Sequence, residues 1–277
     1  MHAFEADIQS TVHPLVDGHS HIDQYDAAEL PGLLERAQRA SVGLIIAAGT
    51  TLASCAKAID LADAHPLVHA GVGLHPQDLE GPVDDAVEGE LRRLAAHAKV
   101  VEWSETGLDY MPASPDRDMQ QEAFRRQIRI AVDLGLPLVT HSREADEDTL
   151  RILREEHAGD VGGAWHYFGG DADLAERIMD LGFLISLAKP LLRIEPLQGV
   201  AAKLPLDRLV IETDSFPQPF KKHRERWTEP WHLPQVAAKV AELQGIDIES
   251  VAEATTGNYL RMLKGRVDPG SLPLPID

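Results

Sequence analysis

Short apolar segments alternate with amphipathic segments along almost the whole chain, and this alternation restricts the possible folds more than any other feature. The apolar segments are rich in β-branched residues, as is typical of strands buried on both faces of a parallel sheet. We predict eight such strands, at residues 15–17, 42–49, 67–74, 100–104, 136–140, 163–165, 183–187 and 209–212. We predict helices between them at residues 27–40, 53–64, 84–98, 119–134, 145–156, 172–181 and 198–204, followed by two more at 233–244 and 248–263.

Eight strand–helix units in strict alternation favour an α/β fold, a TIM-type (β/α)8 barrel extended by C-terminal helices. The length of 277 residues fits one such barrel. We therefore expect a single domain over residues 1–277, with its core at 15–263 and an irregular tail at 264–277. A doubly wound open sheet is the alternative, although no Gly-x-Gly-x-x-Gly motif follows the first predicted strand.

Charge and cysteine content limit the partners and the compartment. The chain has 26 basic and 45 acidic residues, a formal net charge of −19. This argues against a general polyanion-binding surface, but it permits a nucleic-acid substrate held by metal ions and a few local cations. The single cysteine, Cys55, predicts no disulfide framework and no disulfide-linked partner, and it fits a reducing compartment.

The sequence gives no sign of membrane insertion or secretion. No apolar stretch approaches the roughly 20 residues of a membrane helix, and residues 1–13 lack the basic start and apolar core of a secretory signal. We therefore expect a cytoplasmic protein with no membrane partner. Nothing in the sequence indicates its oligomeric state.

Histidines and carboxylates gather where predicted strands end. Asp17, His19 and His21 alternate after an apolar pair, so we expect them on one face of a strand, where the two imidazoles can bind one metal. The candidate ligands at later strand ends are Glu105, His141, His166 and Asp214. Because the carboxyl ends of parallel strands meet at one face of a barrel, these residues predict the site of a metal-dependent hydrolase.

Three carboxylates allow more than one interpretation. Glu102 and Glu105 have an odd offset, so a regular strand would point one of them toward the helices. We assign the site to Glu105, at the predicted strand end beside a glycine, because its two oxygens could bridge two cations. Asp214 could instead cap a helix, but we favour a role as ligand and as acceptor of a proton from water.

Other polar side chains past strand ends are predicted to contact substrate, although a charge run is usually only a solvated face. His75, in Gly73-Leu74-His75-Pro76, is also a candidate catalytic residue. The remaining predicted contacts are Tyr110, Arg143, Lys221 and His223, the last two from the most basic stretch of an acidic chain.

These motifs occur in the order found in TatD-like metal-dependent hydrolases, and the chain resembles that family over residues 15–263. The motifs are Asp17-Gly18-His19-Ser20-His21, Gly73-Leu74-His75-Pro76, Glu105-Thr106-Gly107-Leu108-Asp109, His141-Ser142-Arg143, His166-Tyr167-Phe168-Gly169, Glu212-Thr213-Asp214 and Glu229-Pro230. The resemblance implies a TIM-type barrel of the amidohydrolase superfamily with a two-metal site, and deoxyribonuclease activity as in several members. It also implies that Glu229 contacts substrate.

The resemblance further implies which residues hold each metal. His19, His21, Glu105 and Asp214 would hold one divalent ion, and Glu105, His141 and His166 would hold the other. Such a mixed ligand set suits zinc, manganese, iron or magnesium.

The chain departs from the family pattern near the expected site. Trp103-Ser104 stands where the family usually has Ile-Gly, and we expect this change to narrow the pocket. Tyr167, the segment around Lys189 and the segment after Asp214 also differ. Since several of these departures lie in loops that would surround the scissile bond, they leave the substrate open.

We expect hydrolysis by metal-activated water, with Glu105, Asp214 and His75 as the catalytic side chains. The resemblance favours a DNA end or a short oligonucleotide as substrate. One alternative is an ester or amide hydrolase, including an enzyme that deacylates aminoacyl-tRNA or a small molecule. Another is a non-catalytic scaffold, although buried clusters of His and carboxylates are costly to keep without a metal.

Overall fold

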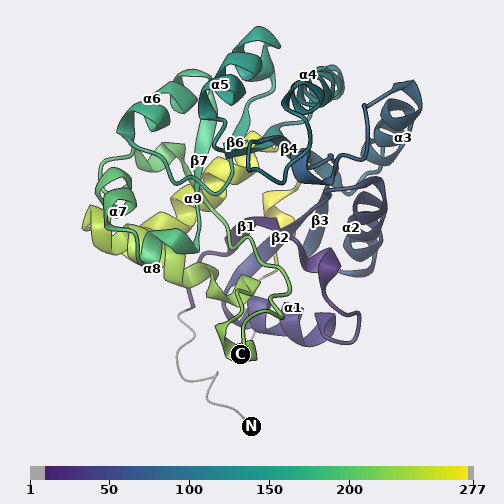
Figure 1. Cartoon of the computed structure of the whole chain (residues 1–277). Helices are drawn as coiled ribbons and strands as arrows, with labels where there is room; N and C mark the ends of the chain where they lie inside the picture. The colour runs from purple at the N-terminus through teal and green to yellow at the C-terminus, as the bar shows by residue number, and fades with distance from the viewer. Residues whose placement is uncertain (1–9, 274–277) are drawn as a thin grey trace.

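A computed structural model describes residues 10–273 as an eight-stranded parallel barrel within a ring of helices (Figure 1). The strands follow one another in chain order: β1 (Leu15–Ser20), β2 (Val42–Ala48), β3 (Val68–Gly71), β4 (Val100–Asp109), β5 (Leu138–Arg143), β6 (Gly163–Trp165), β7 (Phe183–Leu187) and β8 (Leu209–Ile211). A parallel bridge between Ser20 and Ser215 joins the first strand to the segment after the last. The predicted TIM-type architecture is therefore confirmed.

Helices connect the strands and cover the outside of the barrel (Figure 1). They are α1 (Leu30–Arg39), α2 (Leu52–Ala64), α3 (Asp85–Ala95), α4 (Arg117–Leu134), α5 (Asp146–Glu155), α6 (Ala172–Asp180), α7 (Glu195–Ala201), α8 (Leu233–Gln244) and α9 (Ile248–Met262). Aspartates start four of them by accepting hydrogen bonds from first-turn N–H groups, at Asp84, Asp116, Asp171 and Asp247. Among residues 10–273, none of the helices is both long and apolar enough to cross a membrane.

The apolar core has two layers, and the inner one decides where a site can form. The larger layer lies between strands and helices and includes Trp103 and Phe124. The smaller layer fills the barrel near the amino ends of the strands, where Val16 and Val101 pack with Tyr259 of α9. α9 packs against β1 and β8 at this end of the barrel, and a site in a (β/α)8 barrel is expected at the opposite end, where the strands have their carboxyl ends.

Three strands, β1, β4 and β5, run beyond their predicted ends, and two of them, β1 and β4, contain extra residues. Between β1 and β2, Asp17 pairs with Ile45 but Ser20 pairs with Ala47, so β1 has one residue too many. β4 has an extra residue against β3 and another against β5. Each bulge resets the alternation of side chains between the two faces.

We expected Glu102 and Glu105 to point in opposite directions, one of them toward the helices, but the bulges turn both side chains inward. Glu102 does not point toward the helices: its Oε2 lies 2.6 Å from the hydroxyl of Tyr259, which belongs to the inner layer. Glu105 also faces the barrel interior, among the histidines described below. A regular strand cannot place both side chains inside, and the extra residues of β4 make it possible.

A hydrogen-bonded group under the site determines the charge of Glu102. The Tyr259 hydroxyl lies 2.7 Å from the carbonyl oxygen of Gly18 and 2.6 Å from Glu102 Oε2. The hydroxyl has one proton and the carbonyl can only accept, so both contacts are satisfied when the Glu102 carboxyl keeps its own proton. Burial agrees with this, because it raises the pKa of Glu102 to about 8.

We expect Tyr259→Phe to destabilise the fold by about 1–3 kcal/mol, because it leaves the buried Glu102 carboxyl and Gly18 carbonyl without this partner. Gly18 lies directly against the tyrosine ring, since a Cβ added there would be only 2.2 Å from Tyr259 Cε2. Urea unfolding measures the change, with Tyr167→Phe as control because the Tyr167 side chain is 40% exposed. Equal stability of the two variants would contradict this account.

The predicted tail is only partly irregular. Within residues 264–273 there is a short 3-10 helix, Pro269–Ser271, and Leu272 packs against the inner layer. The rest of that prediction, residues 274–277, lies outside the described residues, as do residues 1–9 of the segment searched for a secretory signal.

Candidate metal centre

Glu105 lies at the centre of a cluster of imidazoles at the open end of the barrel. Its Oε2 lies 3.3 Å from His19 Nε2 and 3.5 Å from His21 Nε2. Its Oε1 faces three further ring nitrogens: His141 Nδ1 at 3.0 Å, His75 Nε2 at 3.6 Å and His166 Nε2 at 3.6 Å. The carboxylate thus presents one oxygen to each of two groups of histidines.

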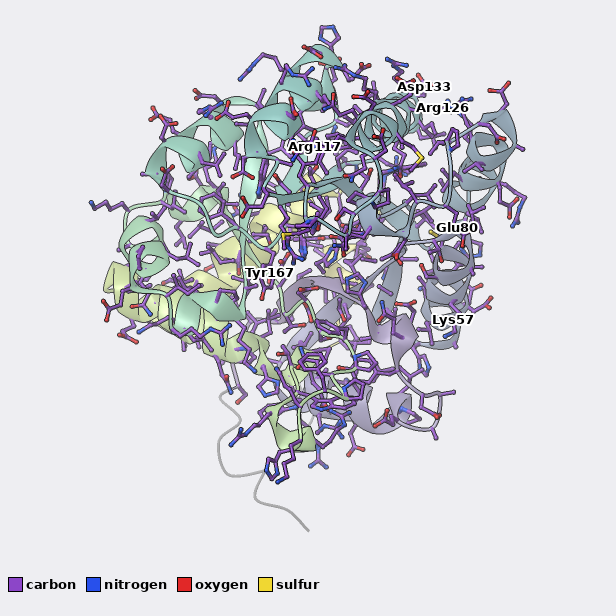
Figure 2. The ribbon with its side chains drawn as sticks, viewed as in Figure 1. Lys57, Glu80, Arg117, Arg126, Asp133 and Tyr167 are labelled. Carbon is purple, nitrogen blue, oxygen red and sulfur yellow. The ribbon has the colours of Figure 1, made fainter. Side chains whose placement is uncertain are left out.

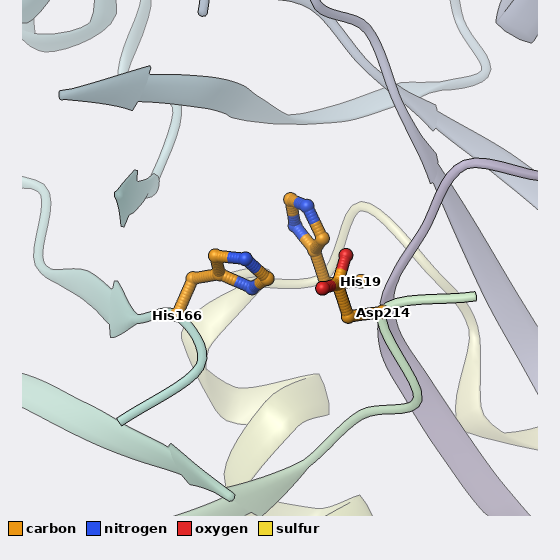
Figure 3. Close-up of side chains that lie close together, drawn as sticks. All are labelled: His19, His166 and Asp214. Carbon is orange, nitrogen blue, oxygen red and sulfur yellow. The ribbon is translucent and has the colours of Figure 1, made fainter. Parts of the chain in front are cut away.

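Asp214 completes the cluster from the segment after β8. Its Oδ1 lies 3.5 Å from His21 Nε2. Figure 3 shows the side chains of His19, His166 and Asp214 close together, and one ligand atom from each lies within 4.8 Å of the others. The Asp214 side chain is 19% exposed, more than any of the histidines around Glu105. It is therefore the member of the cluster most open to water.

Carboxylates and a carbonyl orient three of the imidazoles from behind. Glu212 Oε1 lies 2.8 Å from His166 Nδ1, and Asp109 Oδ2 lies 3.1 Å from His141 Nε2. The carbonyl of Ala48 lies 3.3 Å from His21 Nδ1. Such contacts fix which ring nitrogen carries the proton and leave the other directed at the cluster.

We did not predict Glu212 and Asp109 as site residues, although the sequence contains a signal for both. Glu212 stands two residues before Asp214, and Asp109 stands four residues after Glu105. Even spacing on an extended chain places such pairs on one face. A search for carboxylates at even offsets from each candidate ligand would have found them.

The cluster contains a buried ligand atom that has no hydrogen-bond partner within the part of the chain that the structure describes, as expected of a metal site. His19 Nε2 is buried and has no hydrogen-bond partner among residues 10–273, although it lies 3.3 Å from Glu105 Oε2. A lone pair buried in this way is costly unless a cation or a proton occupies it. Three groups of ligand atoms in the described chain are close enough to share an ion: His19–His21–Glu105, His75–Glu105–His141 and His19–His166–Asp214.

His75 is a possible metal ligand, a role that we did not predict for it. The sequence suggested a substrate contact and a catalytic role, but the side chain lies with Glu105 and His141 in one of the possible metal-binding groups. Burial lowers the pKa of His75 to about 4, so its imidazole is neutral at pH 7 and can donate a lone pair to a cation.

Local backbone features hold the strands and the ligands in place. Gly107 of β4 has φ +147°, and a Cβ there would lie 1.9 Å from the carbonyl oxygen of His141, so only glycine lets β4 and β5 approach this closely. Tyr167 and Asp214 have φ values of 50° and 49°, which non-glycine residues rarely adopt. Such conformations cluster at functional sites.

Carboxylates control the protonation of the metal-free cluster. Burial would lower the pKa of His21, but Asp214 and Glu105 raise it to about 9. Burial opposes protonation of His166 as well, yet Glu212 and Glu105 raise its pKa to about 10. Burial would raise the pKa of Glu105, but the surrounding imidazoles, led by His75 and His19, hold it well below its usual value.

We expect metal uptake at pH 7 to release protons, because the raised pKa values of His21 and His166, about 9 and about 10, keep both rings protonated until a cation displaces the proton. The apparent metal affinity should therefore rise with pH above neutrality. Calorimetry in two buffers with different ionisation enthalpies measures the protons released. Heats that do not depend on the buffer, with an affinity flat in pH, would contradict this.

Three predicted substrate contacts lie elsewhere or are already engaged. The Tyr110 hydroxyl donates a hydrogen bond to Asp148 at 2.8 Å, on the side of α4 and α5. Both oxygens of Glu229 are bound by arginines: Arg36 NH2 lies 2.7 Å and Arg224 NH1 lies 2.5 Å away. Tyr110 and Glu229 are thus engaged by other side chains, and His223 is exposed in the loop after β8.

The other two predicted contacts remain available to a substrate. Arg143 follows His141 on β5, has a side chain that is 52% exposed, and approaches Asp109 only to 3.8 Å. Lys221 is partly buried and donates to Gln218 Oε1 at 2.6 Å. Their roles in binding stay predictions.

Two further expectations differ from the structure. Trp103 does not narrow the pocket, because its ring is buried against the helices and its Nε1 donates to Gln127 of α4 at 3.2 Å. Asp17 does not join His19 and His21 at the cluster. It accepts hydrogen bonds from the N–H and the hydroxyl of Thr213, which ties β1 to the segment that carries Asp214.

Comparison with known proteins agrees with this site. A family model described as TatD related DNase matches residues 16–264. The metal-dependent hydrolase YcfH of Escherichia coli (strain K12), described as uncharacterized, is 38% identical over 254 residues, 90% of this chain and 95% of the relative. YabD of Bacillus subtilis (strain 168), described in the same words, is 35% identical over 257 residues, covering 90% and 99%.

A solved structure gives the same result. The crystal structure of YjjV, a TatD homolog from Escherichia coli K12, superposes with a TM-score of 0.81 at 28% identity, covering 91% of this chain and 98% of that one. The family resemblance of the motifs is thus confirmed. Because the family match spans nearly the whole barrel, the chain belongs to the TatD family and is a metal-dependent hydrolase.

Proposed function

We propose that this protein is a two-metal phosphodiesterase that acts on DNA ends or short oligonucleotides. One observation carries the proposal: the two oxygens of Glu105 each face a separate group of histidines, at 3.3 and 3.5 Å on one side and 3.0 to 3.6 Å on the other. A carboxylate in this position can bridge two divalent ions. The description of the matched family as a DNase supports the choice of substrate.

The ligand sets follow from the side of Glu105 on which each residue lies. His19, His21 and Asp214 would hold one ion with Oε2, and His141 and His166 would hold the other with Oε1, where His75 is a further candidate. When bound, two divalent ions lower the pKa of water toward neutrality and neutralise phosphate oxygens.

Asp214 acts as the proton acceptor in this proposal. Burial would raise its pKa, but His21 and the other nearby imidazoles hold the pKa below its usual value, so the carboxylate is ionised at neutral pH. Its partial exposure lets water approach Oδ1, the oxygen that lies 3.5 Å from His21. Asp214 can therefore orient an attacking water and take its proton.

The test is a turnover screen of metal-reconstituted protein. It compares end-labelled single- and double-stranded DNA with aryl phosphodiesters, carboxylic esters and amides, with and without a chelator. We expect chelator-sensitive shortening of DNA. Rapid turnover of esters or amides with intact DNA would overturn the proposal in favour of an acyl hydrolase, since the same ions polarise a carbonyl as well.

We also propose a cytoplasmic location for the enzyme. The support is its single cysteine, Cys55, which is buried and unpaired as expected in a reducing compartment.

A further inference from the structure

Two lysines from different loops are joined through neutral, buried side chains beside the metal centre. Lys189, just after β7, donates from Nζ to Thr228 Oγ1 at 3.3 Å. The N–H of Thr228 donates to Gln218 Oε1 at 3.1 Å, and Lys221 Nζ donates to the same oxygen at 2.6 Å. Thr228 and Gln218 are only 5% and 6% exposed. A fixed framework therefore holds the two ammonium groups near one another.

Among the side chains that the structure describes, no carboxylate is paired with Lys189 or Lys221, in contrast to a cation further along the loop. Arg224, three residues after Lys221, is paired with Glu29 and Glu229 and stacks on Trp227. The basic stretch at residues 221–226 is thus divided. Arg224 is paired with carboxylates, whereas Lys221 is joined to Lys189 of the loop after β7. Two lysines held by neutral oxygens repel each other, and a protein gains nothing from that repulsion unless an anion binds.

Arg193 adds a third positive charge to the two lysines. Burial lowers the pKa of Lys189, and Lys221 and Arg193 lower it further. Burial and Arg193 lower the pKa of Lys221 in the same direction. Arg193 lies at the exposed end of the 3-10 turn that begins at Lys189, and Lys189 is joined to Lys221 through Thr228 and Gln218.

The three cations belong to the face of the barrel that carries the metal centre. Lys189 follows the carboxyl end of β7, between the strands that lead to His166 and Asp214. Tyr167 lies beside His166, with ring centroids 5.7 Å apart, and Figure 2 shows it within the ring of helices. Tyr167 follows the carboxyl end of β6, the strand next to β7, and β7 leads to Lys189 and Arg193.

We propose that Lys189, Lys221 and Arg193 form a subsite for a second phosphate group of the substrate, next to the phosphate held at the metal centre. This inference rests on the proposed phosphodiesterase function. It narrows the substrate to nucleotides and oligonucleotides with a phosphate flanking the scissile bond. The half-exposed Tyr167 ring offers a surface on which the intervening nucleoside can stack.

The subsite also accounts for selectivity in an acidic chain. With a formal charge of −19, the protein repels anions in general. Lysine ammonium groups bind phosphate by charge-assisted hydrogen bonds. A local cluster of three cations therefore admits a dianionic ligand at one end of the site without creating a surface that binds nucleic acid everywhere.

A binding experiment tests the subsite without requiring turnover. Calorimetry on the metal-loaded protein compares thymidine 3′,5′-bisphosphate with thymidine 5′-monophosphate. Wild type should bind the bisphosphate about tenfold or more tightly, and Lys189→Gln/Lys221→Gln should lose this preference, since each charge-assisted contact contributes roughly a factor of ten. Thermal unfolding checks that the variant folds.

A matched control removes the same type of charge elsewhere. Lys203 is exposed and stands between α7 and β8, at the closed end of the barrel. Lys203→Gln should keep the wild-type preference. A preference that survives in the double variant, or falls equally in the control, would overturn the subsite.

A second measurement separates failure of the subsite from failure of the proposed function. Bis(4-nitrophenyl) phosphate has one phosphodiester and no flanking phosphate, so a phosphodiesterase should hydrolyse it whether or not the subsite exists. Hydrolysis of this ester without any preference for the bisphosphate would reject the subsite and keep the phosphodiesterase. Preferential binding of the bisphosphate without hydrolysis of any phosphodiester would reject the phosphodiesterase and keep an anion site.

Discussion

Replacement of Glu105 by glutamine is expected to lower metal-dependent hydrolysis about 1,000-fold or more. The carboxylate lies between two groups of histidines, so a neutral amide removes the charge shared by both and turns an NH2 group toward one of them. The measurement is kcat/KM at saturating metal, together with the metal content of the purified variant. We expect the content to fall with the activity.

Glu102→Gln is the matched control for this substitution. Glu102 is buried in the same strand, but it is already protonated in the hydrogen-bonded group with Tyr259, so glutamine preserves the donor and the charge. Activity should stay within about threefold of wild type, the size of a modest hydrogen-bond change. Equal losses in the two variants would mean that Glu105 has no special position, and would contradict the bridging role.

Asp214→Asn is expected to reduce kcat about 100- to 10,000-fold at saturating metal, the range that general bases contribute. The asparagine retains an oxygen near His21 but cannot take a proton from water. Initial rates at several pH values measure the effect. Wild-type kcat should fall as the pH drops and Asp214 becomes protonated, and the variant should lose that dependence.

Asp173→Asn controls for the loss of one carboxylate. Asp173 lies on α6 with a side chain that is 79% exposed, 3.6 Å from Arg177, and its substitution should leave kcat unchanged. If Asp214→Asn keeps more than a tenth of wild-type kcat, a fall smaller than that expected of a general base, another group must accept the proton.

The fold could be predicted from the sequence because each apolar segment has one role. Strands that are buried on both faces can be recognised by their short length and their apolar, β-branched residues alone. The helices between them begin at aspartate caps such as Asp84 and Asp116. The ends of the elements were less accurate. β4 runs five residues beyond its predicted end, Ser104, because pairing with β5 continues to Asp109 and Arg143.

The candidate site could be predicted to the level of residue types at strand ends. His166 and Asp214 follow β6 and β8 as expected, and the structure brings them to His19. The bulges could not be predicted, because an extra residue in a strand leaves no mark in composition or periodicity. Both Glu102 and Glu105 therefore face inward, and the outward position of Trp103 was missed for the same reason.

Contacts between distant segments were also beyond the sequence. The partnership of Lys189 with Lys221 depends on Thr228 and Gln218, which show no periodic pattern. The engagement of Glu229 by Arg36 depends on the meeting of α1 with the segment after β8. Such contacts decide which polar residues are free to meet a substrate, and only the assembled barrel reveals them.

Stepwise metal titration of the apoprotein, with hydrolysis of single-stranded DNA measured in the same samples, tests the central claim most directly. The bridging position of Glu105 predicts that two equivalents of a divalent ion bind and that DNA hydrolysis rises with the second. Full hydrolysis with one equivalent, or ester turnover with intact DNA at two, would contradict the two-metal phosphodiesterase.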